Sequence, residues 1–121
     1  MVSKQEAKRF ATEWIEAWNS HDIEAILSHY DDEVDYYSPM IGRITGDSSG
    51  RLQGKPAVRA YITEGLRRSP TLQFRLLHTF TGVVSITRHY LNADDPRAAE
   101  VFELSAAGKV CRVLCHYDEL R

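Results

Sequence analysis

One carboxyl group in the sequence stands where an ionised side chain is costly. Glu100 alternates with Phe102 and Leu104 in a strand-like stretch and therefore shares their apolar face. Val101 and Glu103 point the other way. We expect a raised pKa for Glu100 unless an arginine or hydroxyl groups pair with it, which would suit it to proton transfer. The alternative is a hydrated Glu100 at a wet end of the strand.

The histidines and cysteines form no local metal or nucleophile motif. His21 and His29 are eight residues apart on or beside a helix, about 12 Å, which is too far to share a small ion. The remaining histidines fall on three different predicted strands, where no local spacing supports a shared ion and only convergence in the fold could bring them together: His78, His89 and His116. Cys111 and Cys115 lie roughly 13 Å apart along a strand, beyond disulfide reach, and are interpreted as small buried apolar side chains.

Two glycine motifs also fail. Residues 46–50 match G-x-S-x-G, but they lie in a glycine-rich stretch of a chain too short for an α/β-hydrolase. Residues 50–55 lack the glycine spacing of a phosphate loop, and a proline follows the lysine. The sequence therefore predicts neither a metal site nor a cofactor.

Composition indicates one domain over residues 1–121. Hydrophobic residues make up 43% and charged residues 26%, with a net charge of −2, which argues against disorder and against attraction to nucleic acid or anionic membranes. No apolar run approaches 18 residues and the first ten residues lack the apolar core of a signal peptide, so we expect a soluble, cytoplasmic protein.

The small net charge hides an uneven distribution. Residues 1–42 contain three basic and nine acidic side chains, whereas residues 43–75, called the basic block here, contain seven and two. The basic members are Arg43, Arg51, Lys55, Arg59, Arg67, Arg68 and Arg75. This pattern favours a solvated surface. The alternative is that one or two of these arginines face a pocket and hold an anionic group.

Helical periodicity dominates the first half of the chain. A capping box at Ser3 and Glu6 predicts a helix that ends near residue 19, and Asp22 is expected to cap a second helix that buries its apolar stripe through Tyr30. Residues 40–54 are expected to form a long loop. A third helix is predicted from Lys55–Pro56 to residue 69.

Strand periodicity dominates the second half. Residues 34–38 form a short early strand, and residues 71–80 alternate, with Phe74 and Phe80 among those expected on the buried face. Residues 83–92 follow, then a turn at 94–96, and then a hairpin of residues 100–104 and 110–117. Three helices followed by an antiparallel meander predict an α+β fold, with a curved antiparallel sheet wrapped around three N-terminal helices.

Three segments together resemble the SnoaL-like, nuclear transport factor 2-like superfamily. They are WIEAWNSHDIEAILSHYDDEV (14–34), LQGKPAVRAY (52–61) and EVFELSAAGKV (100–110). The resemblance spans nearly the whole chain. It implies a cone-shaped fold with a pocket at its open end, and a homodimer formed through the outer face of the sheet, where Leu77, Val101 and Leu114 are expected.

The ketosteroid isomerases of this superfamily use a tyrosine, an aspartate base and a protonated aspartate. By motif these positions fall on Trp14, Ser38 and Glu100. An indole is only a donor and a serine hydroxyl cannot serve as a base near pH 7, so the resemblance argues against that activity.

The remaining pocket residues follow from strand faces and from the family register. Tyr36 and Ser38 share one face, and the last strand is expected to turn Val113, Cys115 and Tyr117 inward and His116 outward. The full predicted pocket is Trp14, Tyr36, Ser38, Tyr61, Phe102, Val113, Cys115 and Tyr117 around Glu100. The helical aromatic residues suit a core as well as they suit a binding site.

Three functions fit this pattern. The first is proton-transfer catalysis, such as isomerisation, cyclisation or dehydration, on a small hydrophobic carbonyl compound with Glu100 as acid or base. The second is non-catalytic binding of a small hydrophobic ligand. The third is a dimerisation domain that works through its outer sheet face.

Overall fold

The computed structural model describes residues 1–92 and 97–120 and places four helices before the main meander. The helices are α1 (Lys4–Asn19), α2 (Ile23–Leu27), α3 (Ile41–Thr45) and α4 (Lys55–Arg68). The strands are β1 (Tyr30–Tyr37), β2 (Arg51–Gln53), β3 (Phe74–Thr81), β4 (Ser85–Asn92), β5 (Arg97–Leu104) and β6 (Val110–Tyr117). This order confirms the predicted α+β class.

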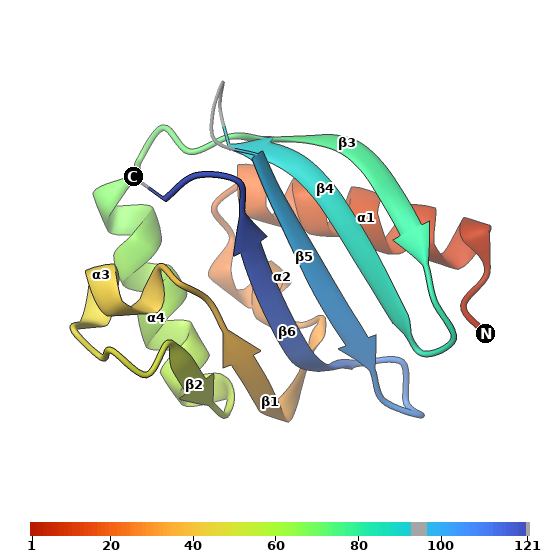
Figure 1. Ribbon diagram of the computed structural model, residues 1–121, viewed down its shortest axis with the longest axis horizontal. Coiled ribbons are helices and arrows are strands. Elements are labelled where there is room, and N and C mark those ends of the chain that lie inside the picture. Colours follow the sequence, from red (N-terminus) through yellow and green to blue (C-terminus); the bar gives the residue numbers. More distant parts are fainter. Residues whose placement is uncertain (93–96, 121) are drawn as a thin grey trace.

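The six strands form one curved sheet in the order β2-β1-β6-β5-β4-β3 (Figure 1). Strands β3 to β6 form the predicted antiparallel meander. The sheet as a whole is mixed, however, because β1 pairs with β6 in parallel. The sequence-based expectation of a wholly antiparallel sheet is therefore wrong at this one junction, which joins segments some 80 residues apart and leaves no local signal.

The predicted helix starts are confirmed at atomic detail. The Ser3 hydroxyl accepts a hydrogen bond from the Glu6 amide at 3.0 Å, and the Asp22 carboxylate accepts one from Ala25 at 3.1 Å. Helix α4 starts at Lys55, with Pro56 in its first turn, where a missing N–H costs nothing. These caps fix where each helix meets the sheet.

The segment expected to be a long loop contains two short elements. Helix α3 ends at Gly46, whose φ of 81° suits the left-handed cap, and β2 pairs with β1 at the sheet edge. Tyr30 opens β1 instead of extending the second helix. Both differences arise because short elements gain most of their stability from tertiary packing, which periodicity does not reveal.

A bulge in β3 changes which side chains face inward. The pairing with β4 shifts between Leu76 and His78, so the alternation reverses beyond that point. Phe80 is 53% exposed, and its expected burial is wrong for this reason. The turn expected at residues 94–96 lies outside the described residues.

The core fills the concave side of the sheet, between the strands and helices α1, α2 and α4. Trp14, Ile26, Val34, Phe102 and Val113 are all essentially inaccessible to solvent. Helix α1 crosses behind the β3–β5 part of the sheet (Figure 1). Within the described residues, no helix has the length and apolar character needed to span a membrane.

Candidate functional site

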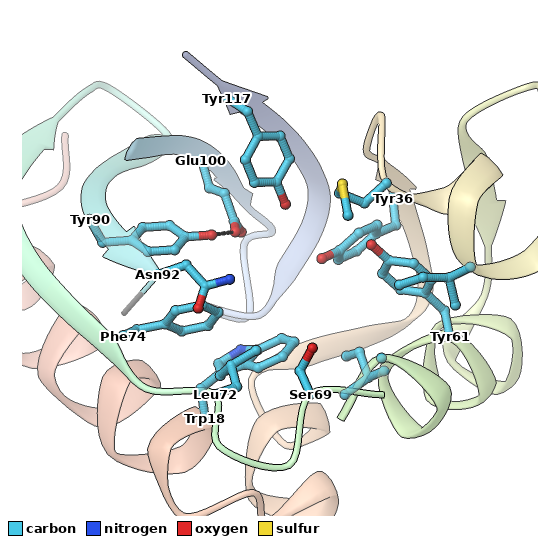
Figure 2. Close-up of a pocket in the computed structure, with 14 residues that line it drawn as sticks. Trp18, Tyr36, Tyr61, Ser69, Leu72, Phe74, Tyr90, Asn92, Glu100 and Tyr117 are labelled. Carbon is cyan, nitrogen blue, oxygen red and sulfur yellow. Dashed lines mark hydrogen bonds between the residues drawn. The ribbon is translucent and has the colours of Figure 1, made fainter. Parts of the chain in front are cut away.

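A cavity of about 120 Å³ lies between the helices and the concave face of the sheet, partly open to solvent (Figure 2). Its wall is made mainly of aromatic and aliphatic side chains, with one carboxyl group. The lining residues are Trp18, Tyr36, Met40, Ile44, Tyr61, Ile62, Gly65, Ser69, Leu72, Phe74, Tyr90, Asn92, Glu100 and Tyr117. No lysine or arginine is among them, so the wall suits a neutral, largely apolar ligand.

The helix wall and the sheet wall are tied together at Asn19. Its side-chain amide donates to the Phe74 carbonyl at 2.9 Å and its carbonyl oxygen accepts from the Phe74 amide at 2.7 Å. A ring nitrogen of His21, a residue with a φ of 57°, lies 2.9 Å from the Leu72 carbonyl. These contacts place Leu72 and Phe74 beside Trp18 on the cavity wall.

Glu100 projects from β5 into this cavity and is 4% exposed. One carboxyl oxygen, Oε1, accepts a hydrogen bond from the Tyr90 hydroxyl (Figure 2). The other oxygen, Oε2, is buried and has no hydrogen-bond partner among the described residues. Burial raises the pKa of Glu100, and the charge of Arg88 opposes that rise.

Three tyrosine hydroxyls are directed toward the same space as Glu100 (Figure 2). Tyr36, Tyr61 and Tyr117 come from β1, α4 and β6, and burial raises the pKa of each. They therefore stay protonated at neutral pH and can donate hydrogen bonds. The arrangement combines one proton acceptor with several neutral donors in an apolar cavity.

Arg88 lies beneath this arrangement, on the same face of the sheet as Glu100. Its guanidinium carbon is 3.4 Å from the centre of the Trp14 ring and 3.5 Å from that of Phe102. The side chain is 0% exposed, and its three nitrogens have no hydrogen-bond partner among the described residues. Contact with these two aromatic rings stabilises its charge by cation–π interaction.

Only part of the predicted pocket is on the cavity wall. Tyr36, Tyr61, Glu100 and Tyr117 line it. The others lie behind the wall: Trp14, Ser38, Phe102, Val113 and Cys115. The catalytic or binding roles of all nine residues remain predictions. The five residues behind the wall could act only indirectly, through the residues that line the cavity.

Two of these buried residues contact the wall from behind. The Cys115 thiol lies 3.7 Å from the Tyr36 hydroxyl, to which it can donate, and burial raises the pKa of that thiol. The Ser38 hydroxyl accepts from the Met40 amide at 3.2 Å and interacts with the Tyr61 and Tyr117 hydroxyls. His116 is exposed on the outer face, as the predicted register requires.

The basic block does not contribute to the cavity. None of its arginines or its lysine lines the wall, and most form ion pairs at the surface, such as Arg59 with Glu24 and Arg67 with Glu64. The solvated-surface interpretation is therefore the better one. Among the described residues, no three His, Cys, Asp or Glu side chains gather to hold a metal ion.

Sequence reasoning missed two buried polar residues, Arg88 and Tyr90, and two polar residues of the cavity wall, Ser69 and Asn92. Ile86, Arg88 and Tyr90 alternate along β4 and are all buried. The signal was the same one that singled out Glu100, a charged residue on the apolar face of a strand. Applied to residues 85–92, it identifies Arg88.

The outer face of the sheet carries a few apolar side chains. Leu77 is 38% exposed, whereas Val101 and Leu114 are partly covered by their neighbours. Phe80, Val83 and Val84 are more exposed, at the end of the β3–β4 hairpin. Dimerisation through this face stays a prediction.

Comparison with known proteins gives a consistent fold assignment. A family model for the SnoaL-like domain matches residues 11–113. A SnoaL-like protein of unknown function from Burkholderia thailandensis is 45% identical and superimposes with a TM-score of 0.93 over 98% of both chains. A comparison with curated protein sequences finds no match.

Two more distant structures share the fold alone. One is a candidate isomerase of the SnoaL-like family from Agrobacterium tumefaciens, with 16% identity and a TM-score of 0.72 over 95% of this chain and 99% of that one. The other is SalBIII, an epoxide hydrolase/cyclase-like enzyme of pyran ring formation in salinomycin, with 19% identity and a TM-score of 0.65 over 97% and 94%.

Proposed function

The chain belongs to the SnoaL-like family, and from its pocket we propose that it catalyses proton transfer on a small, neutral, hydrophobic carbonyl compound. The observation that carries the proposal is the buried carboxyl of Glu100 on the wall of an apolar cavity, with one oxygen, Oε2, that has no hydrogen-bond partner among the described residues. A carboxyl whose pKa is raised by burial is a stronger base when ionised, which suits it to moving a proton to or from carbon. Isomerase and cyclase-like neighbours of the same fold are consistent with this class of chemistry.

The chemistry divides between the two sides of the cavity. Glu100 exchanges a proton with the carbon next to the carbonyl group, while neutral tyrosine hydroxyls donate hydrogen bonds to the carbonyl oxygen. Those bonds strengthen as negative charge develops on that oxygen, and they therefore lower the barrier. Tyr36, Tyr61 and Tyr117 are the available donors.

The size of the cavity limits the substrate. A dry protein cavity of about 150 Å³ holds one benzene molecule, and this cavity measures about 120 Å³. It therefore encloses about one six-membered ring, with any larger part of the ligand at the mouth. A four-ring steroid does not fit inside it.

The test uses a one-ring probe, the isomerisation of cyclohex-3-enone to its conjugated isomer, followed by ultraviolet absorbance. We expect E100Q to slow the reaction by about 10²–10⁴-fold. The matched control is E103Q, three residues along β5 on the opposite face, beside Arg112 at 3.8 Å. Retention of the full rate in E100Q would exclude Glu100 as the proton carrier.

Non-catalytic binding is the alternative that the same oxygen favours, because an unpaired acceptor equally suits a ligand with an O–H donor. Phenol, which matches the cavity in size, is the probe. If phenol raises the unfolding temperature of the wild type but not of E100Q, while cyclohex-3-enone and other small ketones show no turnover, the pocket binds without catalysing.

A further inference from the structure

Arg88 and Glu100 lie side by side on two neighbouring strands. They are direct partners in the antiparallel register of β4 and β5, so their β-carbons lie about 5 Å apart on the concave face. Both side chains are buried, and no other lysine, arginine, aspartate or glutamate is buried among the described residues. They form an isolated pair of opposite charges inside the protein, called the interior pair here.

The charge of Arg88 requires compensation that only Glu100 can supply. Burial lowers the pKa of Arg88 to about 9, so the guanidinium still carries its charge at neutral pH. The rings of Trp14 and Phe102 pack against the guanidinium but bring no negative charge. Burying a cation without a counter-charge is costly, so the charge of Arg88 favours the ionised form of Glu100.

The other titratable groups around Glu100 do not replace Arg88. The Tyr90 hydroxyl donates to Oε1 and thereby favours the carboxylate, but it carries no charge. The groups that interact with Glu100 from β1, α4 and β6 are Tyr30, Tyr36, Tyr61, Cys115, His116 and Tyr117. Burial keeps the tyrosines and the cysteine neutral, and His116 is solvent-exposed.

We propose that Arg88 is a positioning residue whose buried charge holds Glu100 as a carboxylate, so that Glu100 starts the reaction as the base. This rests on the proposed function. The Glu100 carboxylate takes the proton from the substrate carbon, and the C–H electron pair moves into the carbonyl group to give an enolate. Return of the same proton to another carbon of the enolate restores the carboxylate. Arg88 acts only through Glu100, since it does not line the cavity.

The test is a titration of the glutamate side-chain carboxyl carbons by ¹³C NMR, without any substrate. The Glu100 signal is assigned by its absence in E100Q. In the wild type we expect it to be ionised at pH 7, and in R88M we expect its pKa to rise by about 1–3. R88K keeps the charge and should stay close to the wild type. R112M removes an arginine from the outer face and should leave Glu100 unchanged.

Two results would overturn the proposal: a Glu100 that is protonated at pH 7 in the wild type, or an unchanged titration in R88M. The first needs no variant of Arg88, so the proposal can fail even where R88M does not fold. Because the titration uses no substrate, it is separate from the turnover test. If Glu100 titrates as expected in the wild type and in R88M but no turnover is found, the proposed function is wrong and the electrostatic role of Arg88 still holds.

Discussion

Arginine side chains occupy two contrasting environments in this protein. In the basic block, Arg59 pairs with Glu24 and Arg67 pairs with Glu64, all at the surface. Arg88 has no hydrogen-bond partner among the described residues and is packed between two aromatic rings. Water can replace the hydrogen bonds of the surface arginines, whereas the buried guanidinium of Arg88 has no access to water.

The contrast shows that hydrogen-bond counts do not measure how much a charged side chain matters. At the surface, an ion pair exchanges water contacts for protein contacts of similar strength, and its net contribution is small. In the interior the reference state is an unpaired charge in a medium of low polarity, so loss of one partner is costly. Loss of a surface ion pair and loss of the interior pair should therefore have different consequences.

The largest effect is expected from removal of the buried guanidinium. R88A should lower the free energy of unfolding by about 3–5 kcal/mol, because it leaves both a void between Trp14 and Phe102 and an uncompensated Glu100. R88M fills the void and should recover part of this loss. The matched surface variant R112A should cost less than about 1 kcal/mol. Urea denaturation measures all three, and equal losses in R88A and R112A would remove the distinction.

The two environments should also give opposite pH dependences of stability. Burial raises the pKa of Glu100, so its contribution is complete below the unfolded value of 4.5 and is lost as the pH rises through the folded value. Hydrogen bonds from Arg67 and Arg68 lower the pKa of Glu64 to about 2, so its contribution is present above 4.5 and is lost as the pH falls toward 2.

Unfolding of the wild type, E100Q and E64Q between about pH 2 and 8 checks these signs. The free energy of unfolding of the wild type, relative to that of E100Q, should fall as the pH rises above 4.5. Relative to that of E64Q, it should fall as the pH drops below 4.5. If the two pH dependences have the same sign, Glu100 is solvated in solution and not buried.

The smallest effect is expected from salt. In about 1 M salt the screening length falls to about 3 Å, which weakens exposed ion pairs but not buried ones. A double-mutant cycle of R88M and E100Q should keep its coupling energy in high salt. A cycle of R59A and E24A should show only a small coupling, which high salt removes. Equal salt sensitivity in the two cycles would contradict the burial of the interior pair.

Much of the site could be predicted where the signal lay within one element. Alternation placed Tyr36 and Glu100 on the concave face, and periodicity placed Tyr61 on the inner side of α4. The same rules put Trp14 and Phe102 in the right layer but could not tell a cavity wall from the core behind it. That difference is only one side-chain length, and it depends on how far the helices stand from the sheet.

What the sequence alone determined was the local structure: the caps at Ser3 and Asp22, the order of the longer helices and strands, and a carboxyl group on an apolar face. Only the tertiary structure decided the parallel pairing of β1 with β6, the bulge that exposes Phe80, and the meeting of Arg88 with Glu100. The physical reason is range. Caps and periodicity act within a few residues, whereas strand partners and opposed charges depend on register between segments that the chain itself does not place side by side.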